Sequence, residues 1–334
     1  MSHVPGPATG EPGRHAPILG AVTSSPPDAR PAPEPRIVAV VVTFNRLGLV
    51  QRLLERLRAE SRLARVVVVD NASTDGTGDW LRGQADDLVH PLLLESNTGG
   101  AGGFAAGLDA AVAAGADLVW LMDDDGTPDP DCLGTLLEHH GALDFWGPVV
   151  VDETDPDRLV FPIRLPGGTR VVHDTASVRA AGVDGLVRGV VIPFNGVLVT
   201  SELVDRIGTV RAELFIWGDD HEYRLRAEAA GARIATVVDA RFRHPAVGEL
   251  GTRMAFGRTT YNHSPSDLKH YCMARNNLVN LRTYKGWPHA LAFVAKTVWF
   301  YSFTRRDAGR LRLSARAMLA GLRGDFTGHR EFLR

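Results

Sequence analysis

The sequence predicts an α/β fold, with an open mixed sheet flanked by helices and a C-terminal helical appendage. Over residues 37–125, apolar β-branched runs alternate with segments of helical periodicity, as in the βαβ units of a parallel sheet. The runs at 37–44 and 65–70 are apolar almost throughout, which is typical of strands buried on both faces. We therefore expect an α/β domain over 36–255 and a helical, basic region over 256–334.

The individual elements follow from the same periodicities. In the first half we expect, in order, strand 37–44, helix 47–62, strand 65–70, helix 76–84, strand 92–94, a glycine-rich helix ending at 114, and strand 117–122. In the second half we expect short antiparallel strands at 147–151, 159–163 and 170–173, a central strand at 190–200, helices at 201–207 and 219–230, and strand 233–239. A loop over 246–266 then leads into a helical remainder.

Composition narrows the class of protein. The 334 residues are 44% hydrophobic, which suffices for a sizeable core, and a net charge of -2 argues against nucleic acid as a partner. Two cysteines, Cys132 and Cys272, are too few for a disulfide framework or a cysteine zinc site. We find no apolar run of about 18 residues and no signal-peptide pattern. These features favour a cytoplasmic enzyme or binding protein.

The two ends of the chain depart from this average. Residues 1–35 hold nine of the 20 prolines, which predicts a disordered tail or, alternatively, an extended segment that docks on a partner. Residues 287–334 hold nine Lys and Arg against three Asp and Glu, interleaved with aromatic residues. Such a stretch suits an anionic membrane surface, but a solvated helical cap on the core explains it equally well. Nucleic-acid binding is a weaker alternative, because no recognised motif accompanies the charge.

The sharpest motif is the triplet Asp123-Asp124-Asp125 at the end of a predicted strand. Adjacent carboxylates repel one another unless a cation offsets them, and their oxygens suit Mg²⁺ or Mn²⁺. In an extended chain Asp123 and Asp125 point to one side and Asp124 to the other. The alternative is a solvated acidic turn. Because ligands bind at the carboxyl ends of parallel strands, we favour a metal site.

Two further features follow neighbouring strands. Arg46 and Asp70 are together suited to clamp a nucleotide, although each alone is better explained as a cap or an ion pair. The segment 100–105 fits the G-x-G-x-x-A dinucleotide fingerprint, which makes a nicotinamide-dependent oxidoreductase the rival hypothesis. Its position after a third strand counts against that hypothesis. The glycines equally suit a diphosphate beside backbone N–H groups, or flexible spacing.

A second acidic pair opens a later helix. Asp219 and Asp220, which follow Trp217-Gly218, are suited to helix capping. A carboxylate held at a helix start beside an apolar side chain is also a candidate general base. One strand later, His244 is a candidate metal ligand through its neutral imidazole, although an isolated histidine is more often structural.

Together these motifs resemble the inverting family 2 glycosyltransferases of the GT-A fold over residues 36–285. The resemblance rests on VVVTFNR (40–46), VVVVDNASTDGT (66–77), SNTGGAGGF (96–104), WLMDDDG (120–126), FIWGDDHEY (215–223) and YCMARNNLVNL (271–281). Within that family, the glycine segment, the triple aspartate and the second acidic pair look most like actinobacterial cell-wall galactofuranosyltransferases. Related rhamnosyltransferases more often carry Glu-Asp at 219–220. Only the proline-rich tail precedes residue 37, where the larger, polymerising galactofuranosyltransferase has a β-rich domain. In this respect the sequence resembles the shorter, initiating type of galactofuranosyltransferase.

The resemblance implies a role for each matching residue. It implies donor binding by Thr43, Arg46, Asp70, Asn97, Gly100 and Asp123. It implies Mn²⁺ or Mg²⁺ ligation by Asp123, Asp125 and His244. It also implies that Asp220 is the catalytic base, with Trp217 and Asp219 beside the acceptor.

The implied activity is transfer of a sugar from a nucleotide donor, expected to be galactofuranose from UDP-galactofuranose, to a polyprenyl-linked saccharide acceptor. A rhamnosyl or other hexosyl transferase of the same fold is the alternative. The acceptor hydroxyl, deprotonated by Asp220, would displace the diphosphate in one in-line step with inversion. The expected location is cytoplasmic, peripheral on the inner face of the plasma membrane through 287–334. The sequence does not indicate an oligomeric state.

Overall fold

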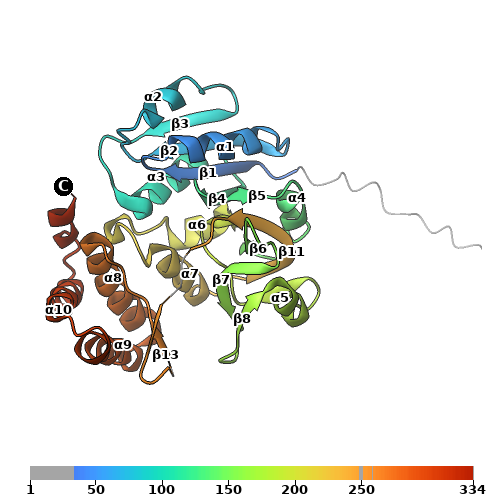
Figure 1. Cartoon of the computed structure of the whole chain (residues 1–334). Coiled ribbons are helices and arrows are strands. Elements are labelled where there is room, and N and C mark those ends of the chain that lie inside the picture. Colours follow the sequence, from blue (N-terminus) through green and yellow to red (C-terminus); the bar gives the residue numbers. More distant parts are fainter. Residues whose placement is uncertain (1–33, 248–250, 258, 334) are drawn as a thin grey trace, which may run out of the picture. The chain divides into compact units, whose positions relative to one another are not determined.

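The computed structural model describes residues 34–247, 251–257 and 259–333. Most of the predicted tail, residues 1–33, lies outside this range. Residues Pro35–Arg334 form one compact unit. Its centre is an 11-stranded mixed sheet in which the main strand order is β3-β2-β1-β4-β10-β6-β11-β5 (Figure 1). This arrangement confirms the α/β class and the mixed sheet expected from the sequence.

The first half of the sheet is parallel, as predicted. Its four strands are β1 (Ile37–Thr43), β2 (Leu63–Asp70), β3 (Val89–Leu93) and β4 (Leu118–Asp123). Register aligns Thr43 with Asp70, and Val42 with Asp123, so the carboxyl ends of three strands meet at one edge. Thr43, Asp70 and Asp123 therefore end neighbouring strands at the same edge of the sheet.

The second half of the sheet is mixed. Strand β10 (Asn195–Thr200) lies antiparallel between β4 and β6 (Phe145–Asp152), which confirms the predicted central strand. Strand β11 (Ile234–His244) runs parallel to β6 and places His244 near the same edge as Asp123. The smaller strands are β5 (Thr127–Pro128), β7 (Arg158–Arg164), β8 (Val171–Asp174) and β9 (Leu186–Arg188). Both β6–β7 and β7–β8 pair antiparallel, as expected for this region.

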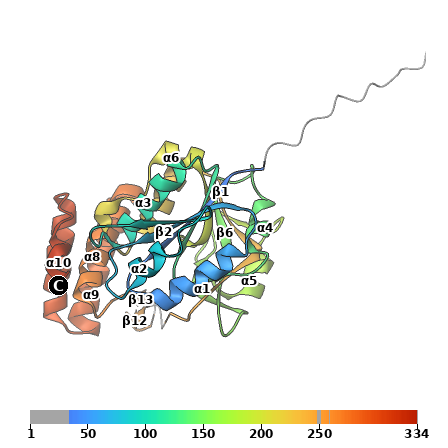
Figure 2. The same cartoon turned by 90° about the horizontal axis from the view of Figure 1, so that it is seen from above.

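Helices cover both faces of the sheet because side chains alternate along buried strands. Ile37, Ala39 and Val41 of β1 pack with helices α1 (Leu47–Arg58) and α4 (Cys132–Leu137). The intervening residues of β1 pack with α3 (Gly99–Ala113), α6 (Ser201–Ile207) and α7 (Asp219–Ala229). Figure 2 shows α1 and α3 on opposite sides of β1 and β2. Two shorter helices are α2 (Thr77–Arg82) and α5 (Thr175–Ala181).

The glycine-rich segment is helical from Gly99 onward, and its glycines serve close packing. A Cβ at Gly103 would lie 2.5 Å from Val42 Cγ1, and one at Gly107 would lie 2.3 Å from Val40 Cγ1. Helix α3 can therefore approach β1 more closely than a helix with side chains at these positions. Close helix–strand contact places the N-terminus of α3 at the edge where the strands end.

The C-terminal part is helical, as predicted, with α8 (Asp267–Lys285), α9 (Trp287–Trp299), a π-helical turn (Phe300–Thr304), α10 (Ala308–Leu322) and a 3₁₀ segment (Gly328–Phe332). The expected loop at 246–266 contains a hairpin of β12 (Thr252–Met254) and β13 (Thr259–Tyr261). Met254 and Tyr261 pack against Phe300 and Tyr301, and this burial explains why the segment is ordered into strands. Within the described residues, no helix combines the length and apolarity that a membrane span requires.

Candidate active site

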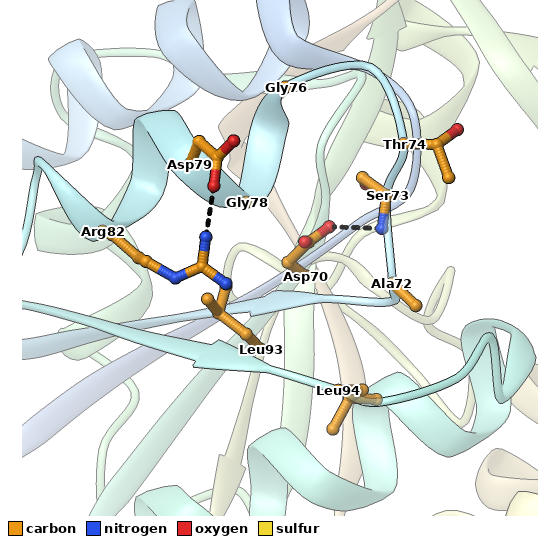
Figure 3. A pocket seen from close by; sticks show the side chains of 10 residues that line it. All are labelled: Asp70, Ala72, Ser73, Thr74, Gly76, Gly78, Asp79, Arg82, Leu93 and Leu94. Carbon is orange, nitrogen blue, oxygen red and sulfur yellow. Dashed lines mark hydrogen bonds and ion pairs between the residues drawn. The ribbon is translucent and has the colours of Figure 1, made fainter.

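A pocket of about 420 Å³ opens beside the end of β2 (Figure 3). Asp70 is buried there, and its Oδ1 accepts a hydrogen bond from the backbone N–H of Ser73 at 3.2 Å. A Cβ at Gly78 would lie 2.8 Å from Asp70 Oδ2, so a larger residue there would displace the Asp70 carboxylate. The lining residues are Asp70, Ala72, Ser73, Thr74, Gly76, Gly78, Asp79, Arg82, Leu93 and Leu94. A fixed carboxylate between backbone and leucine side chains suits a flat ring that carries N–H donors.

The triple aspartate is held by two residues from the end of β1. Thr43 Oγ1 donates to Asp124 Oδ2 at 2.6 Å. Arg46 Nη1 donates to Asp124 Oδ1 and to Asp125 Oδ2, each at 2.8 Å. The predicted alternation, with Asp124 pointing away from Asp125, is therefore wrong. Strand β4 ends at Asp123, so the side-chain alternation of an extended strand does not continue into residues 124 and 125.

His244 lies against the third carboxylate of the triplet. Its Nε2 is 3.2 Å from Asp125 Oδ1, and its Nδ1 lies 2.7 Å from the carbonyl oxygen of Pro245. A hydrogen bond from Nδ1 to that carbonyl leaves Nε2 facing Asp125. Burial lowers the pKa of His244, but Asp125 and the Pro245 carbonyl outweigh burial and raise it, so Nε2 can bind a cation only once the ring has lost its extra proton. Burial raises the pKa of Asp125, but His244 and Arg46 outweigh it and hold that pKa below its usual value.

Asp123 is the point at which the carboxylates of the site converge. Burial raises the pKa of Asp123 well above its ordinary value, and the charges of Asp125, Asp124, Asp219 and Asp220 add to the effect. The last two come from the start of α7, nearly 100 residues further along the chain. The site therefore concentrates negative charge between the end of β4 and the start of α7.

The donors at this place fit a divalent cation in part. Among the described residues, no three His, Cys, Asp or Glu side chains are grouped so as to hold a metal ion by themselves. The predicted ligands Asp123, Asp125 and His244 are thus not already grouped around one point. One carboxylate oxygen of Asp125, Oδ2, pairs with Arg46 instead. However, Asp125 Oδ1 is buried and accepts no well-aligned hydrogen bond, and His244 Nε2 is a neighbouring polar atom at 3.2 Å. Magnesium-type ions commonly take one or two carboxylates and complete their shell with substrate phosphates, so the donor set fits such an ion.

The N-terminus of α3 is fixed by two asparagines. Asn71 Oδ1 accepts from Thr98 N at 2.8 Å, and Asn71 Nδ2 donates to the carbonyl oxygen of Gly99 at 2.7 Å. Asn97 Oδ1 accepts from Gly99 N at 2.8 Å. The side-chain oxygen of Asn97 is therefore used to shape the loop. A Cβ at Gly100 would lie 3.9 Å from Asp219 Oδ2, which places the helix start beside the second acidic pair.

Asp219 and Asp220 open α7 after a turn of unusual backbone conformation. Phe215 and Trp217 have φ values of 67° and 65°, and Gly218, the N-cap residue, has 86°. Left-handed conformations at non-glycine residues are uncommon and cluster at functional sites. Trp217, two residues before Asp219, is half-buried. The turn places both carboxylates at the positive end of the helix dipole.

The two carboxyls of this pair are perturbed together. Burial and the neighbouring Asp220 charge raise the pKa of Asp219 to about 8. Burial also raises the pKa of Asp220, against a hydrogen bond from the backbone N–H of His221 at 2.6 Å. Two close carboxyls whose pKa values are both raised titrate as a coupled pair, so this pair holds a proton more readily than an isolated aspartate does.

Three residues of this site were not expected from the sequence. Asp124 was assigned no role, yet it holds Thr43 and Arg46. Asn71 follows Asp70 directly, so its place at a strand end was a signal for it. Asn276, on α8, donates to carbonyl oxygens of the turn that precedes the acidic pair. The matching motif at 271–281 pointed to this helix without indicating what it contacts.

The fold is that of the GT-A class of proteins. The chain superposes on GalNAc-T7 with UDP, GalNAc and Mn²⁺ at a TM-score of 0.56, with 13% identity, covering 89% of this chain and 58% of that one. It superposes on S. aureus TarS 1-349 at a TM-score of 0.50, with 18% identity, covering 88% and 80%. At these identities the likeness establishes the fold alone.

Sequence comparison gives the family. The model of glycosyl transferase family 2 matches residues 38–171. Galactofuranosyltransferase GlfT1 of Mycolicibacterium smegmatis is 30% identical over 303 residues, which are 87% of this chain and 97% of that protein. GlfT1 of Mycobacterium tuberculosis is 34% identical, over 81% and 90%. The undecaprenyl-phosphate mannosyltransferase of Micrococcus luteus is 29% identical, over 60% and 82%. This chain belongs to glycosyltransferase family 2, and it is a glycosyltransferase.

Proposed function

We propose that this enzyme transfers galactofuranose from UDP-galactofuranose to a lipid-linked saccharide in cell-wall or surface glycan synthesis. The observation that carries the proposal is the convergence of Asp123, at the end of β4, with Asp219 and Asp220, at the start of α7. With this arrangement a candidate base would lie near the carboxylate at the end of β4, where the donor nucleotide would bind. The choice of sugar is supported by the similarity to the GlfT1 proteins over most of both chains.

The nucleotide of the donor would occupy the edge formed by β1, β2 and α3. The Asp70 carboxylate suits the N–H of a uracil ring or a ribose hydroxyl, inside the pocket beside β2. At the start of α3 the N–H groups of Thr98, Gly99 and Ala101 donate within the protein. The N–H of Gly100 and the positive end of the helix dipole would therefore face the diphosphate. Thr43 and Arg46 lie at this edge, where both donate hydrogen bonds to Asp124. Asn97 accepts a hydrogen bond from Gly99 N and so shapes the loop that leads into α3.

We include a divalent cation, Mn²⁺ or Mg²⁺, in the proposal. Asp123, Asp125 and His244 would hold it, together with oxygens of the diphosphate. When bound, such an ion offsets the negative charge that develops on the leaving diphosphate. The carboxylates at this edge would attract the cation. Before it binds, Arg46 offsets part of their charge through its ion pairs with Asp124 and Asp125.

In the chemical step, the acceptor hydroxyl attacks the anomeric carbon from the face opposite the diphosphate. Asp220 accepts the hydroxyl proton, the C–O bond to the diphosphate breaks, and the configuration inverts in a single displacement. Asp219 stays protonated at neutral pH because its pKa is raised to about 8, so it can donate a hydrogen bond to the acceptor. Trp217 beside them offers an apolar face to a sugar ring.

A lipid-linked acceptor would be met at a membrane surface, and residues 256–334 would provide the contact. Exposed apolar side chains gather on α9, the π-helical turn and α10; they are Trp287, Leu291, Val298, Trp299, Phe303, Leu319 and Leu322. Together with the basic residues of 287–334, they suit an anionic membrane. The location that follows is cytoplasmic, on the inner face of the membrane.

The base assignment is tested by Asp220→Asn, with Asp219→Asn as the matched variant. Asp220→Asn removes the proton acceptor and keeps the shape, so kcat should fall by about 10³-fold or more while UDP still binds. Asp219→Asn keeps a hydrogen-bond donor and should retain more activity than Asp220→Asn. Full activity of a folded Asp220→Asn variant would show that the assignment is wrong.

A further inference from the structure

The backbone before the acidic pair is held in a conformation that its own sequence disfavours. Within the four residues 215–218, Phe215, Trp217 and Gly218 have positive φ. Two of these are bulky residues, for which the left-handed region is a genuine outlier. Such a backbone persists when surrounding groups fix it, so the partners of its carbonyl groups matter.

A buried asparagine about 60 residues away contacts three carbonyl oxygens of the segment 214–217, and Arg275 beside it also donates to the carbonyl oxygen of Leu214 at 2.9 Å. Asn276 Nδ2 lies 2.9 Å, 3.1 Å and 2.7 Å from the carbonyl oxygens of Leu214, Ile216 and Trp217. Its own Oδ1 accepts from Arg275 Nε at 2.9 Å, which fixes the orientation of the amide. Asn276 has no exposed surface, so water does not replace it as a donor.

The contact continues along one stripe of α8. Asn280 Nδ2 donates to the carbonyl oxygen of Gly218 at 2.7 Å, and Tyr284 donates to Glu222 Oε1 at 2.5 Å. Asn276, Asn280 and Tyr284 are spaced by four residues, which places them on the same face of a helix. The stripe therefore follows the chain from the turn into the first turn of α7.

The opposite side of the turn rests on the start of α3. The carbonyl oxygen of Phe215 accepts from Ala101 N at 3.0 Å. Gly99 has a φ of 72°, and a Cβ there would lie 2.0 Å from the same oxygen. The turn is thus clamped between α8 and the glycine-rich helix start. A displacement of the turn would move Asp219 and Asp220 relative to the donor edge.

We propose that Asn276 and Asn280 are positioning residues, which fix the 214–218 backbone so that Asp219 and Asp220 face the acceptor hydroxyl. This inference rests on the proposed function of the acidic pair, and it assigns α8 a direct part in turnover. Neither asparagine side chain is placed in the donor pocket. Their loss therefore affects the chemical step more than donor binding.

The test compares Asn276→Ala and Asn280→Ala with Asn277→Ala in the full chain. Asn277 is the same residue type on the same helix, half-buried, and outside the stripe that contacts the turn. We expect kcat to fall about 100-fold in Asn276→Ala and about tenfold in Asn280→Ala, since a misplaced base costs orders of magnitude. The KM for the donor and the affinity and stoichiometry for UDP should stay within about twofold, and Asn277→Ala should match wild type.

Two outcomes overturn the inference. One is an unchanged kcat in variants that melt like wild type. Another is loss of UDP-binding stoichiometry in proportion to activity, which would indicate a purely structural role. If Asn276→Ala does not fold, Asn280→Ala, which loses one hydrogen bond, decides by the same criteria. Asp220→Asn is measured in parallel to separate the two proposals. Full activity of Asp220→Asn would refute the base assignment. An inactive Asp220→Asn together with fully active Asn276→Ala and Asn280→Ala would refute the positioning role alone.

Discussion

Arg46 Nη1 lies 2.8 Å from Asp125 Oδ2, and the same nitrogen donates to Asp124. One guanidinium thus offsets two of the three consecutive carboxylates, while Asp123 remains beside the acidic pair of α7. The side chain of Asp124 is almost completely buried. The arrangement explains how a triplet of aspartates is stable in the folded protein before any cation binds.

We predict that Arg46→Gln destabilises the protein and makes it more dependent on a cation. Removing the guanidinium leaves Asp124 buried with its hydrogen bond from Thr43, at a cost of about 1–3 kcal/mol in the free energy of unfolding. Added Mn²⁺ should then raise the melting temperature of the variant more than that of wild type. Arg52→Gln on the exposed face of α1 is the control. Equal responses of both variants to Mn²⁺ would contradict this account.

The raised pKa of Asp219 predicts a pH-dependent effect of Asp219→Asn. Because its folded-state pKa is about 8, against 3.8 ordinarily, the folded protein holds this proton more tightly and loses stability as pH rises between these values. Asparagine carries no such penalty. The variant should therefore match wild type near pH 4 and exceed it by at least about 1 kcal/mol at pH 8. Denaturant unfolding with a chelator present measures this, and parallel curves from pH 5 to 9 would count against it.

The packing of α3 predicts opposite effects for two Gly→Ala changes. At Gly103 the new Cβ would lie 2.5 Å from Val42, so Gly103→Ala should cost about 1–3 kcal/mol of stability. At Gly48, in α1, nothing lies within 4 Å of the added Cβ, so Gly48→Ala should stabilise by about 0.5–1 kcal/mol. Denaturant unfolding of both variants measures the difference. A neutral Gly103→Ala would show that α3 does not depend on close packing.

The exposed aromatic residues predict which face binds a membrane. Phe303 is 64% exposed and lies between the basic helices, whereas Val183 is 66% exposed and lies in the α/β part. Phe303→Ser should weaken sedimentation with anionic vesicles about two- to tenfold, while Val183→Ser should not. Vesicles of neutral lipid should bind less in all cases. Equal binding by Phe303→Ser and Val183→Ser would exclude this face as the contact.

The strand-end part of the site could be predicted from the sequence because parallel strands align their carboxyl ends. Thr43, Asp70 and Asp123 each end a recognisable apolar run, so their neighbourhood follows from topology. Asp124 was misjudged because the alternation rule holds within a strand, and β4 ends one residue earlier. The roles that the sequence assigned to Asp220 and His244 stay predictions for the experiments above to decide.

The support of the acidic pair could not be predicted, because it depends on tertiary contacts between distant segments. Asn276 meets the 214–217 carbonyl groups through the packing of α8, and helix periodicity does not say which residues a buried face will meet. The hairpin at 252–261 was missed for a similar reason. Its strands are short, and they are ordered by burial of Tyr261 against Phe300.

The central claim is that this glycosyltransferase uses a UDP-sugar and a divalent cation, and a donor panel tests it most directly. The purified protein is incubated with UDP-galactofuranose, UDP-galactopyranose or dTDP-rhamnose, with Mn²⁺ or with a chelator, and scored for donor hydrolysis and for transfer to a polyprenyl-linked saccharide. The account predicts turnover of UDP-galactofuranose that the chelator reduces by at least about 100-fold. Turnover of dTDP-rhamnose in preference to the UDP-sugars, or full activity in the chelator, would contradict it.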